Sequence, residues 1–240
     1  MKKDFSTLKF SNGFKDGLPI GLGYLAVSIA FGVKASLSGV PVLIALLTSM
    51  TNLTSAGQLA GLEVIATCGT LIEIIVVQLV INARYFLMSL TLSQKVDKSF
   101  NVTHRALCAF AVTDEIFGMV SSKPQSIGKN YFYGLMILPY IGWATGTLIG
   151  AVAGDILPSV VASALGLGLY AMFIAIIIPP SVKHRGVLAV VGLSAIISCI
   201  LYYVPLFDKI SSGFSIIISA ILSSAIVAWL FPVKKGDENE

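Results

Sequence analysis

The sequence contains few charged residues. Only 12% of its 240 residues are Asp, Glu, Lys or Arg, whereas 56% are hydrophobic and the mean hydropathy is +0.89. Soluble domains carry about 25% charged residues, so this chain cannot cover a water-facing surface. Its basic residues cluster at the ends of apolar segments, which is typical of membrane topology determinants and argues against nucleic-acid binding. The composition predicts an integral membrane protein embedded in the lipid bilayer.

Cysteine and histidine are also scarce. The three cysteines, Cys68, Cys108 and Cys199, lie in apolar stretches without paired spacing, which argues against a disulfide framework or a zinc site. The two histidines, His104 and His184, lie in separate polar segments. The sequence has no P-loop, no H-E-x-x-H and no G-x-S-x-G motif. We therefore expect no catalytic residues, no metal, no cofactor and no enzymatic activity.

Long apolar runs account for most of the chain. A spanning helix needs about 20 mostly apolar residues, and eight segments qualify: 17–38, 41–65, 68–92, 105–121, 131–153, 157–179, 187–204 and 210–231. The fourth is short, so we expect an all-α polytopic membrane protein with seven or eight transmembrane helices. Residues 17–231 would form a single transmembrane transport domain, with a cytoplasmic segment at 1–16 and a cytoplasmic tail at 232–240.

The distribution of Lys and Arg predicts the orientation. With the N-terminus inside, the eight-span interpretation places ten basic residues on the cytoplasmic side and five on the outer side, so both termini should be cytoplasmic. The loop 94–104 fits poorly, because it is basic and yet falls outside. If one of the spans is re-entrant, this loop moves to the inner side.

Glycines in the first and fifth spans form similar patterns. Gly17-x3-Gly21 and Gly146-x3-Gly150 are typical of helices that pack closely in lipid. The series Gly23-Tyr24, Gly32, Gly39-Val40-Pro41 also resembles the series Gly142-Trp143, Gly150, Gly154, Pro158. The similarity indicates an internal repeat with both copies starting on the same side, although glycine-rich helices also match by chance.

The segment from Leu47 to Gln58 is the most polar stretch within any predicted span. It contains five hydroxyl residues, two amides and a glycine. A helix broken here would offer free N–H groups and free carbonyls to a zwitterionic ligand. The alternative is a continuous helix whose hydroxyls bond back to their own carbonyls. The candidate substrate-binding residues are Asn52, Thr54, Ser55, Gly57 and Gln58, together with Tyr24, which lies deep enough to line a pocket.

Five charged residues lie in apolar surroundings: Glu63, Glu73, Arg84, Asp114 and Glu115. A charge at the bilayer centre costs about 2.5–3.5 kcal/mol, so such groups are paired, hydrated or functional. Arg84 should meet Asp114 or Glu115, and adjacency makes those two carboxylates diverge by about 100°. The pair could be a structural ion pair, a gate or a proton carrier.

The positions of Asn82, Glu63 and Glu73 in the predicted spans indicate their roles. Asn82 precedes Arg84 in the same run and joins the candidate coupling and gating residues, which are Asn82, Arg84, Asp114 and Glu115. Glu63 and Glu73 lie near a predicted cytoplasmic turn, where a solvated inner mouth is expected.

Several short motifs resemble the AzlC family of bacterial membrane proteins. They occur in the family's order and spacing over about residues 12–230: Gly17-Leu18-Pro19-Ile20-Gly21-Leu22-Gly23-Tyr24, Ala30-Phe31-Gly32, Ser55-Ala56-Gly57-Gln58-Leu59-Ala60, Asn82-x-Arg84-Tyr85 and Thr113-Asp114-Glu115. The resemblance implies a permease of the bacterial cytoplasmic membrane that exports leucine, isoleucine, valine and their analogues. It also implies a small hydrophobic AzlD-like partner subunit. Family members commonly carry histidine or another residue where this chain has Tyr85, which leaves the substrate open.

The residues alone also allow two other functions. The chain could be the substrate-capturing membrane subunit of an ATP-driven importer for a vitamin or a metal. It could also be a membrane scaffold without transport, in which all the buried charges are paired and no cavity exists.

Overall fold

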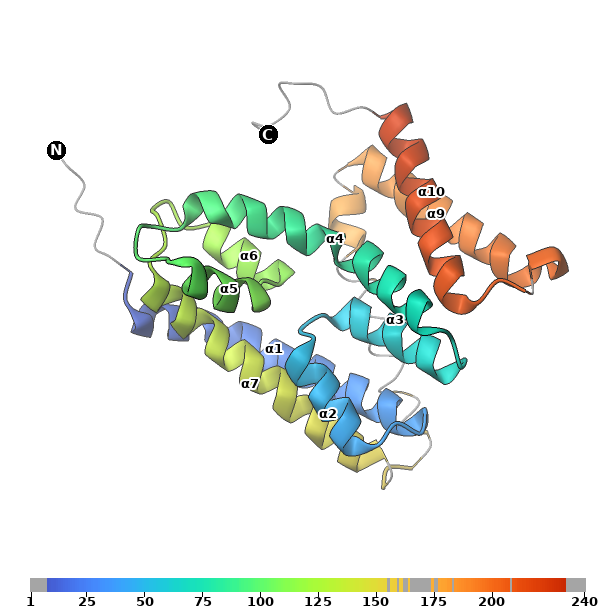
Figure 1. The fold of residues 1–240 in the computed structure, drawn as a ribbon, viewed down its shortest axis with the longest axis horizontal. Helices are drawn as coiled ribbons and strands as arrows, with labels where there is room; N and C mark the ends of the chain where they lie inside the picture. The colour runs from blue at the N-terminus through green and yellow to red at the C-terminus, as the bar shows by residue number, and fades with distance from the viewer. Residues whose placement is uncertain are drawn as a thin grey trace. The chain divides into compact units, whose positions relative to one another are not determined.

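The computed structural model describes residues 8–154, 156–158, 160–161, 164, 174, 177–182, 184–207 and 209–231. These residues are helical almost throughout, and their β pairing is limited to one isolated bridge between Val96 and Ile127. The helices are α1 (Phe10–Leu37), α2 (Val42–Thr51), α3 (Ser55–Ala66), α4 (Leu71–Lys95), α5 (Val102–Phe110), α6 (Asp114–Ser121), α7 (Lys129–Gly154), α9 (Arg185–Tyr203), the 3-10 turn η1 (Pro205–Phe207) and α10 (Ser212–Leu230) (Figure 1).

Five of these helices are long and apolar enough to cross a membrane: α1, α4, α7, α9 and α10. They confirm the predicted all-α polytopic class. Two predicted spans are interrupted, since 41–65, where a break was predicted, and 105–121, where none was predicted, each form two short helices. Of the predicted span 157–179, most residues lie outside the described part of the chain, as does the tail 232–240. The first helix begins at Phe10, within the segment expected to precede the membrane domain.

The chain divides into two compact units. The first contains residues 1–59 and 81–169, and the second contains residues 60–80 and 170–240. In the first unit, apolar side chains of α4, α6 and α7, including Leu92, Ile116 and Phe132, share one buried core. In the second unit, α9 packs against α10, with a hydrogen bond of 3.0 Å between Ser198 and Ser219.

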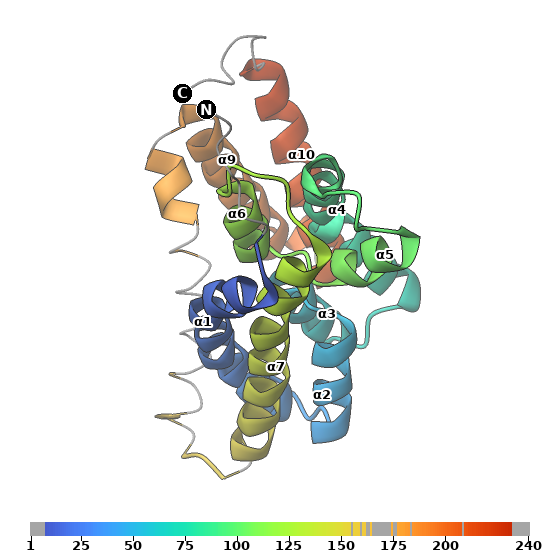
Figure 2. The ribbon, with the colours of Figure 1, turned by 90° about the vertical axis from the view of Figure 1, so that its left-hand side faces the viewer.

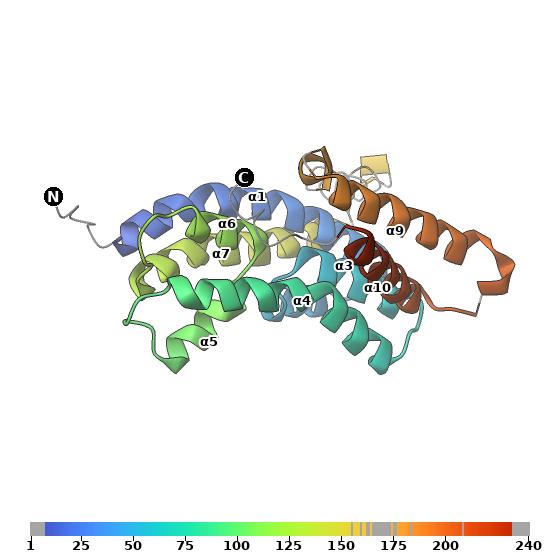
Figure 3. The same ribbon diagram turned by 90° about the horizontal axis from the view of Figure 1, so that it is seen from above.

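The first unit is built on α1 and α7, which lie side by side over their length (Figures 1 and 3). A Cβ atom added at Gly17 would lie 2.4 Å from the carbonyl oxygen of Leu135, and one added at Gly150 would lie 2.0 Å from that of Ile29. The two backbones therefore touch, which confirms the close packing predicted from the glycine spacing. Residue numbers rise together along both helices, so the helices are parallel. The internal repeat stays a prediction.

The break between α2 and α3 turns the chain back on itself. Residues 52–54 are not helical, and α2 packs along α7 (Figure 2). Across the break, Gln58 Nε2 donates a hydrogen bond of 3.0 Å to Ser49 Oγ. In a continuous helix these residues would be about 13 Å apart along the axis. The predicted broken helix is confirmed, and its two halves form a hairpin rather than a kinked span.

The break between α5 and α6, at residues 111–113, produces a second hairpin. At its tip Asp114 forms an ion pair of 2.8 Å with Arg84, in the middle of α4. At its end the carbonyl of Ser121 accepts a hydrogen bond of 2.6 Å from Lys95 Nζ, at the last residue of α4. The hairpin therefore leaves the C-terminal end of α4, reaches the middle of that helix and returns.

These hairpins change the predicted topology of the first unit. The loop after α4 lies at the end of the first unit where α7 begins, because Asp97 N donates a hydrogen bond of 3.0 Å to the carbonyl of Ile127 and Val96 forms a bridge with the same residue. The eight-span interpretation placed this loop opposite the start of α1, which is wrong. Lys34 lies near the far end of α1. Seven basic residues lie at the end where α1 and α7 begin: Lys9, Lys15, Lys95, Lys98, Arg105, Lys123 and Lys129. The positive-inside rule predicts that this end is cytoplasmic.

Candidate functional site

Arg84 and Asp114 form the ion pair expected from the sequence. Arg84 Nη1 lies 2.8 Å from Asp114 Oδ2 and donates a hydrogen bond of 3.1 Å to Oδ1. The two side chains are 38% and 36% exposed, so the pair lies at a partly accessible position. Asp114 is the first residue of α6, whose cap Thr113 accepts from Ile116 N at 3.4 Å. The positive end of the α6 dipole therefore also stabilises this carboxylate.

Glu115 points away from this pair, as the adjacency of the two carboxylates predicted. Its carboxylate accepts a short hydrogen bond from the hydroxyl of Tyr24 on α1. Tyr24 is buried and packs edge-on against Trp143 with the ring centroids 5.3 Å apart. The second carboxylate thus attaches the α5/α6 hairpin to the α1–α7 pair, while the first attaches it to α4.

Thr54 attaches the tip of the α2/α3 hairpin to the same stretch of α4. Its hydroxyl donates a hydrogen bond of 2.9 Å to Asn82 Oδ1. The same hydroxyl accepts hydrogen bonds of 3.4 Å from the hydroxyl of Tyr85 and of 3.3 Å from Gly57 N. Tyr85 in turn accepts 3.1 Å from Arg84 Nη2, and the guanidinium carbon lies 4.9 Å from the centre of the Tyr85 ring. A continuous series of polar contacts therefore runs from one hairpin tip to the other through α4.

Gln58 belongs to a third, fully buried cluster. The residue is 2% exposed, donates to Ser49 and accepts 3.0 Å from Trp143 Nε1. Ser49 also shares a hydrogen bond of 2.7 Å with Thr147 of α7. All these groups have protein partners, so a ligand at Gln58 would have to replace them. The other two candidates flank the break: Asn52 caps the C-terminus of α2 and Ser55 begins α3.

The structure thus brings the ten candidate residues into one region of the first unit, although in separate contacts. Thr54 contacts Asn82, and Arg84 contacts Asp114. Tyr85 links these two pairs through Thr54 and Arg84. In the sequence, Tyr85 stood out only as a departure from the motif of the family that the chain resembles. Trp143 stood out only in the possible repeat and Thr147 not at all, because neither residue carries a local signal for a partner on another helix.

The sequence suggested a solvated inner mouth for Glu73; its side chain is buried, although it borders an open pocket of 400 Å³ with Lys209 and Phe214. It is 2% exposed and lies in the second unit, where Gly213 N donates 2.8 Å to its Oε1 and Ser211 Oγ makes a short hydrogen bond to the same atom. The carboxylate therefore binds the first turn of α10, where the helix dipole favours a negative charge. Glu63 is half-buried.

The geometry defines a polytopic membrane protein in which two folded-back hairpins meet on a charged segment of one long helix. The model of the AzlC protein family matches residues 19–157, which include all ten candidate residues. The chain belongs to the AzlC family of membrane proteins.

Curated relatives carry membrane-protein names. An uncharacterized membrane protein of Archaeoglobus fulgidus is 30% identical over 189 residues, covering 78% of this chain and 82% of the relative. Inner membrane protein YgaZ of Escherichia coli is 29% identical over 177 residues, covering 70% and 72%. A membrane protein of Helicobacter pylori is 27% identical over 155 residues, covering 61% and 67%. No solved structure matches the chain.

Proposed function

We propose that this protein is a secondary transporter that exports branched-chain amino acids across the bacterial cytoplasmic membrane, coupled to the proton gradient. The observation that carries the proposal is the meeting of both hairpin tips on Asn82, Arg84 and Tyr85 of α4. Interrupted helices at membrane depth are tolerated where they line a cavity or are buried in protein, and transporters use them to bind ions and substrates. Membership of the AzlC family supports the same assignment.

The break at residues 52–54 suits a zwitterionic substrate. The end of α2 provides backbone carbonyls for an ammonium group, and the start of α3 provides N–H groups for a carboxylate. Tyr24, Leu53 and Trp143 form an apolar cluster beside the break, which suits an aliphatic side chain. Asn52, Ser55 and Gly57 supply further polar groups at the same place. In this proposal Gln58 exchanges a protein partner for the substrate.

The Arg84–Asp114 pair suits a coupling role. A proton on Asp114 would remove the negative charge that holds the guanidinium, and Arg84 would be free to leave it. Arg84 also binds Tyr85, and Tyr85 binds Thr54. The loss of the ion pair would therefore change the contacts of the α2/α3 hairpin with α4. Proton binding and substrate release would then be linked through three residues.

The test is efflux of preloaded labelled leucine from cells that express the chain with a small AzlD-like subunit. We expect Asp114→Asn to abolish efflux driven by the proton gradient while the protein still folds and inserts. The matched control is Asp16→Asn, because Asp16 also forms an ion pair, of 2.7 Å with Lys123, but outside the candidate site. This control should retain efflux.

Three outcomes contradict parts of the proposal. Unchanged efflux in Asp114→Asn would refute the coupling role. Equal efflux after collapse of the proton gradient would refute proton coupling. An absence of leucine efflux from the wild-type chain, with and without the small subunit, would favour the importer-subunit or scaffold alternatives.

A further inference from the structure

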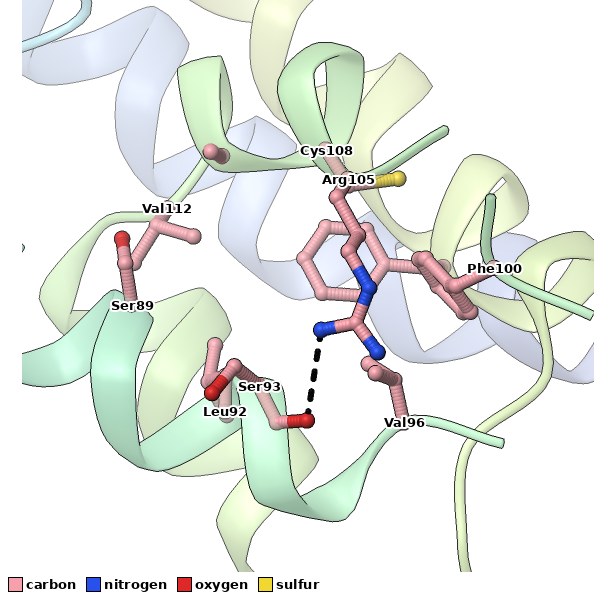
Figure 4. A pocket seen from close by; sticks show the side chains of 10 residues that line it. Ser89, Leu92, Ser93, Val96, Phe100, Arg105, Cys108 and Val112 are labelled. Carbon is pink, nitrogen blue, oxygen red and sulfur yellow. Dashed lines mark hydrogen bonds between the residues drawn. The ribbon is translucent and has the colours of Figure 1, made fainter. Parts of the chain in front are cut away.

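An apolar pocket lies in the first unit, at the end where α1 and α7 begin. It lies between the C-terminal half of α4, helix α5 and Phe132 of α7, and its volume is 140 Å³ (Figure 4). Its walls are mostly aliphatic and aromatic, and include Leu92, Val96, Phe100 and Val112. None of the ten candidate residues lines it, so it is distinct from the site on the middle of α4.

The size of this pocket fits a small aliphatic molecule. A dry apolar cavity of about 150 Å³ accommodates benzene, which has six carbon atoms. The side chains of leucine and isoleucine have four carbons, and that of valine has three. The volume would therefore admit one branched aliphatic side chain.

Arg105 places one positive charge against this apolar surface. It lies in the first turn of α5, and its Nη1 donates a hydrogen bond of 3.4 Å to the carbonyl of Ser93 (Figure 4). A guanidinium carries five N–H groups, and among the described residues the structure gives this one a single hydrogen bond and no ion pair. By contrast, Lys123 at the same end is paired with Asp16. Arg105 therefore retains donors for a carboxylate.

The inner wall of the pocket leads to the candidate transport site. Val112 lines the pocket and belongs to the break at the tip of the α5/α6 hairpin, two residues before Asp114. A ligand that displaces Val112 would move the segment that carries the Arg84–Asp114 ion pair. The pocket therefore borders the segment that leads to Asp114.

We propose that this pocket is the entry site for the exported amino acid, in which Arg105 binds the substrate carboxylate and the apolar walls receive the aliphatic side chain. The inference rests on the proposed export function, and it identifies where the substrate first binds. It assigns selectivity for an aliphatic molecule that carries a carboxylate. A fatty acid or an anionic lipid has the same combination of groups, so the experiment separates these ligands.

The test measures binding of labelled leucine to the full-length protein in nanodiscs of phosphatidylcholine alone. Competition by 4-methylpentanoate, which lacks the amine, and by 3-methylbutylamine, which lacks the carboxylate, identifies the group that Arg105 recognises. We expect Arg105→Gln to weaken the binding of leucine and of 4-methylpentanoate about ten-fold, because one hydrogen bond to a charged group is lost. The binding of 3-methylbutylamine should not change. The control Lys98→Gln removes a cation from the preceding loop and should bind like the wild type.

A second measurement does not depend on an arginine variant. Cys108 lines the pocket, whereas Cys68 and Cys199 are exposed. In a Cys68→Ser, Cys199→Ser background, saturating leucine should slow the alkylation of Cys108 by a maleimide at least several-fold.

The outcomes separate the two proposals. If the wild type exports leucine but Arg105→Gln binds and exports like Lys98→Gln, and leucine does not protect Cys108, the entry site is refuted and the export function stands. If the Arg105→Gln defect appears only when anionic lipid is present, Arg105 binds lipid headgroups and the entry site is also refuted. If the wild type exports no leucine in cells, the proposed function itself fails.

Discussion

The contact between α1 and α7 allows a quantitative prediction at Gly150. In the structure, a Cβ atom at this position would lie 2.0 Å from the carbonyl oxygen of Ile29 and 2.8 Å from its carbonyl carbon. Both are backbone atoms of a helix, so a side-chain rotation cannot relieve the collision. The Gly150→Ala variant therefore forces the two helices apart or distorts one of them.

The size of the effect follows from these distances. Restoring an ordinary contact of 3.4 Å requires a displacement of about 1.4 Å. A gap of about 0.5–1 Å already removes a quarter to a half of the dispersion energy of the atoms that face it. Neighbouring contacts, such as that of Gly142 with the Gly21 carbonyl, would open as well. Overpacking usually costs about 1–3 kcal/mol, and we expect about 3 kcal/mol here.

The assay is unfolding by SDS in mixed micelles, followed by circular dichroism. The matched control is Gly23→Ala on α1, because a Cβ there meets no atom within 4 Å. Alanine is favoured over glycine inside a helix by about 1 kcal/mol, so this control should be neutral or slightly stabilising. If Gly150→Ala unfolds at the same SDS fraction as Gly23→Ala, the backbone contact between α1 and α7 is not the basis of this unit.

Two further predictions use the same unfolding assay. Glu73→Gln should destabilise the protein by about 1–2 kcal/mol, because it removes a negative charge from the first turn of α10; stability equal to wild type would show that the charge is not needed. Trp143→Phe should cost about 1–3 kcal/mol, because the buried Gln58 amide oxygen loses its donor. The double variant Trp143→Phe, Gln58→Leu should recover part of that loss, and a purely additive double variant would contradict the pairing.

The Arg84–Asp114 pair and the first break could both be predicted from the sequence, for related reasons. A charge or a run of polar residues in an apolar environment is costly unless it is satisfied, which leaves few arrangements. Arg84 had two carboxylates within reach, and the structure shows Asp114 as its partner. The polar run from Leu47 to Gln58 likewise contains the break at residues 52–54.

The second break was missed because Ala111 and Val112 are apolar and give no sign of an interruption. A local signal did exist: Thr113 followed by Asp114 and Glu115 is typical of a helix start, with a capping hydroxyl and acidic residues in the first turn. The topology error for the loop after α4 followed from this omission. The Glu73 contact with α10 could not be predicted, because nothing near either residue specifies a partner so distant in sequence.

The order of residues on α4 explains how two hairpins can be linked by one helix. Asn82 and Tyr85 are three residues apart and therefore share a face, and both contact Thr54 of the first hairpin. Arg84 is adjacent to Tyr85, so it projects about 100° away and reaches the second hairpin. The hydrogen bond between Arg84 and Tyr85 joins these two faces. The hairpins also contact the α1–α7 pair, through Glu115 with Tyr24 and Ser49 with Thr147, so this bond is one of several links between them. A change at Tyr85 would therefore remove the contacts that join these two faces without removing any charge.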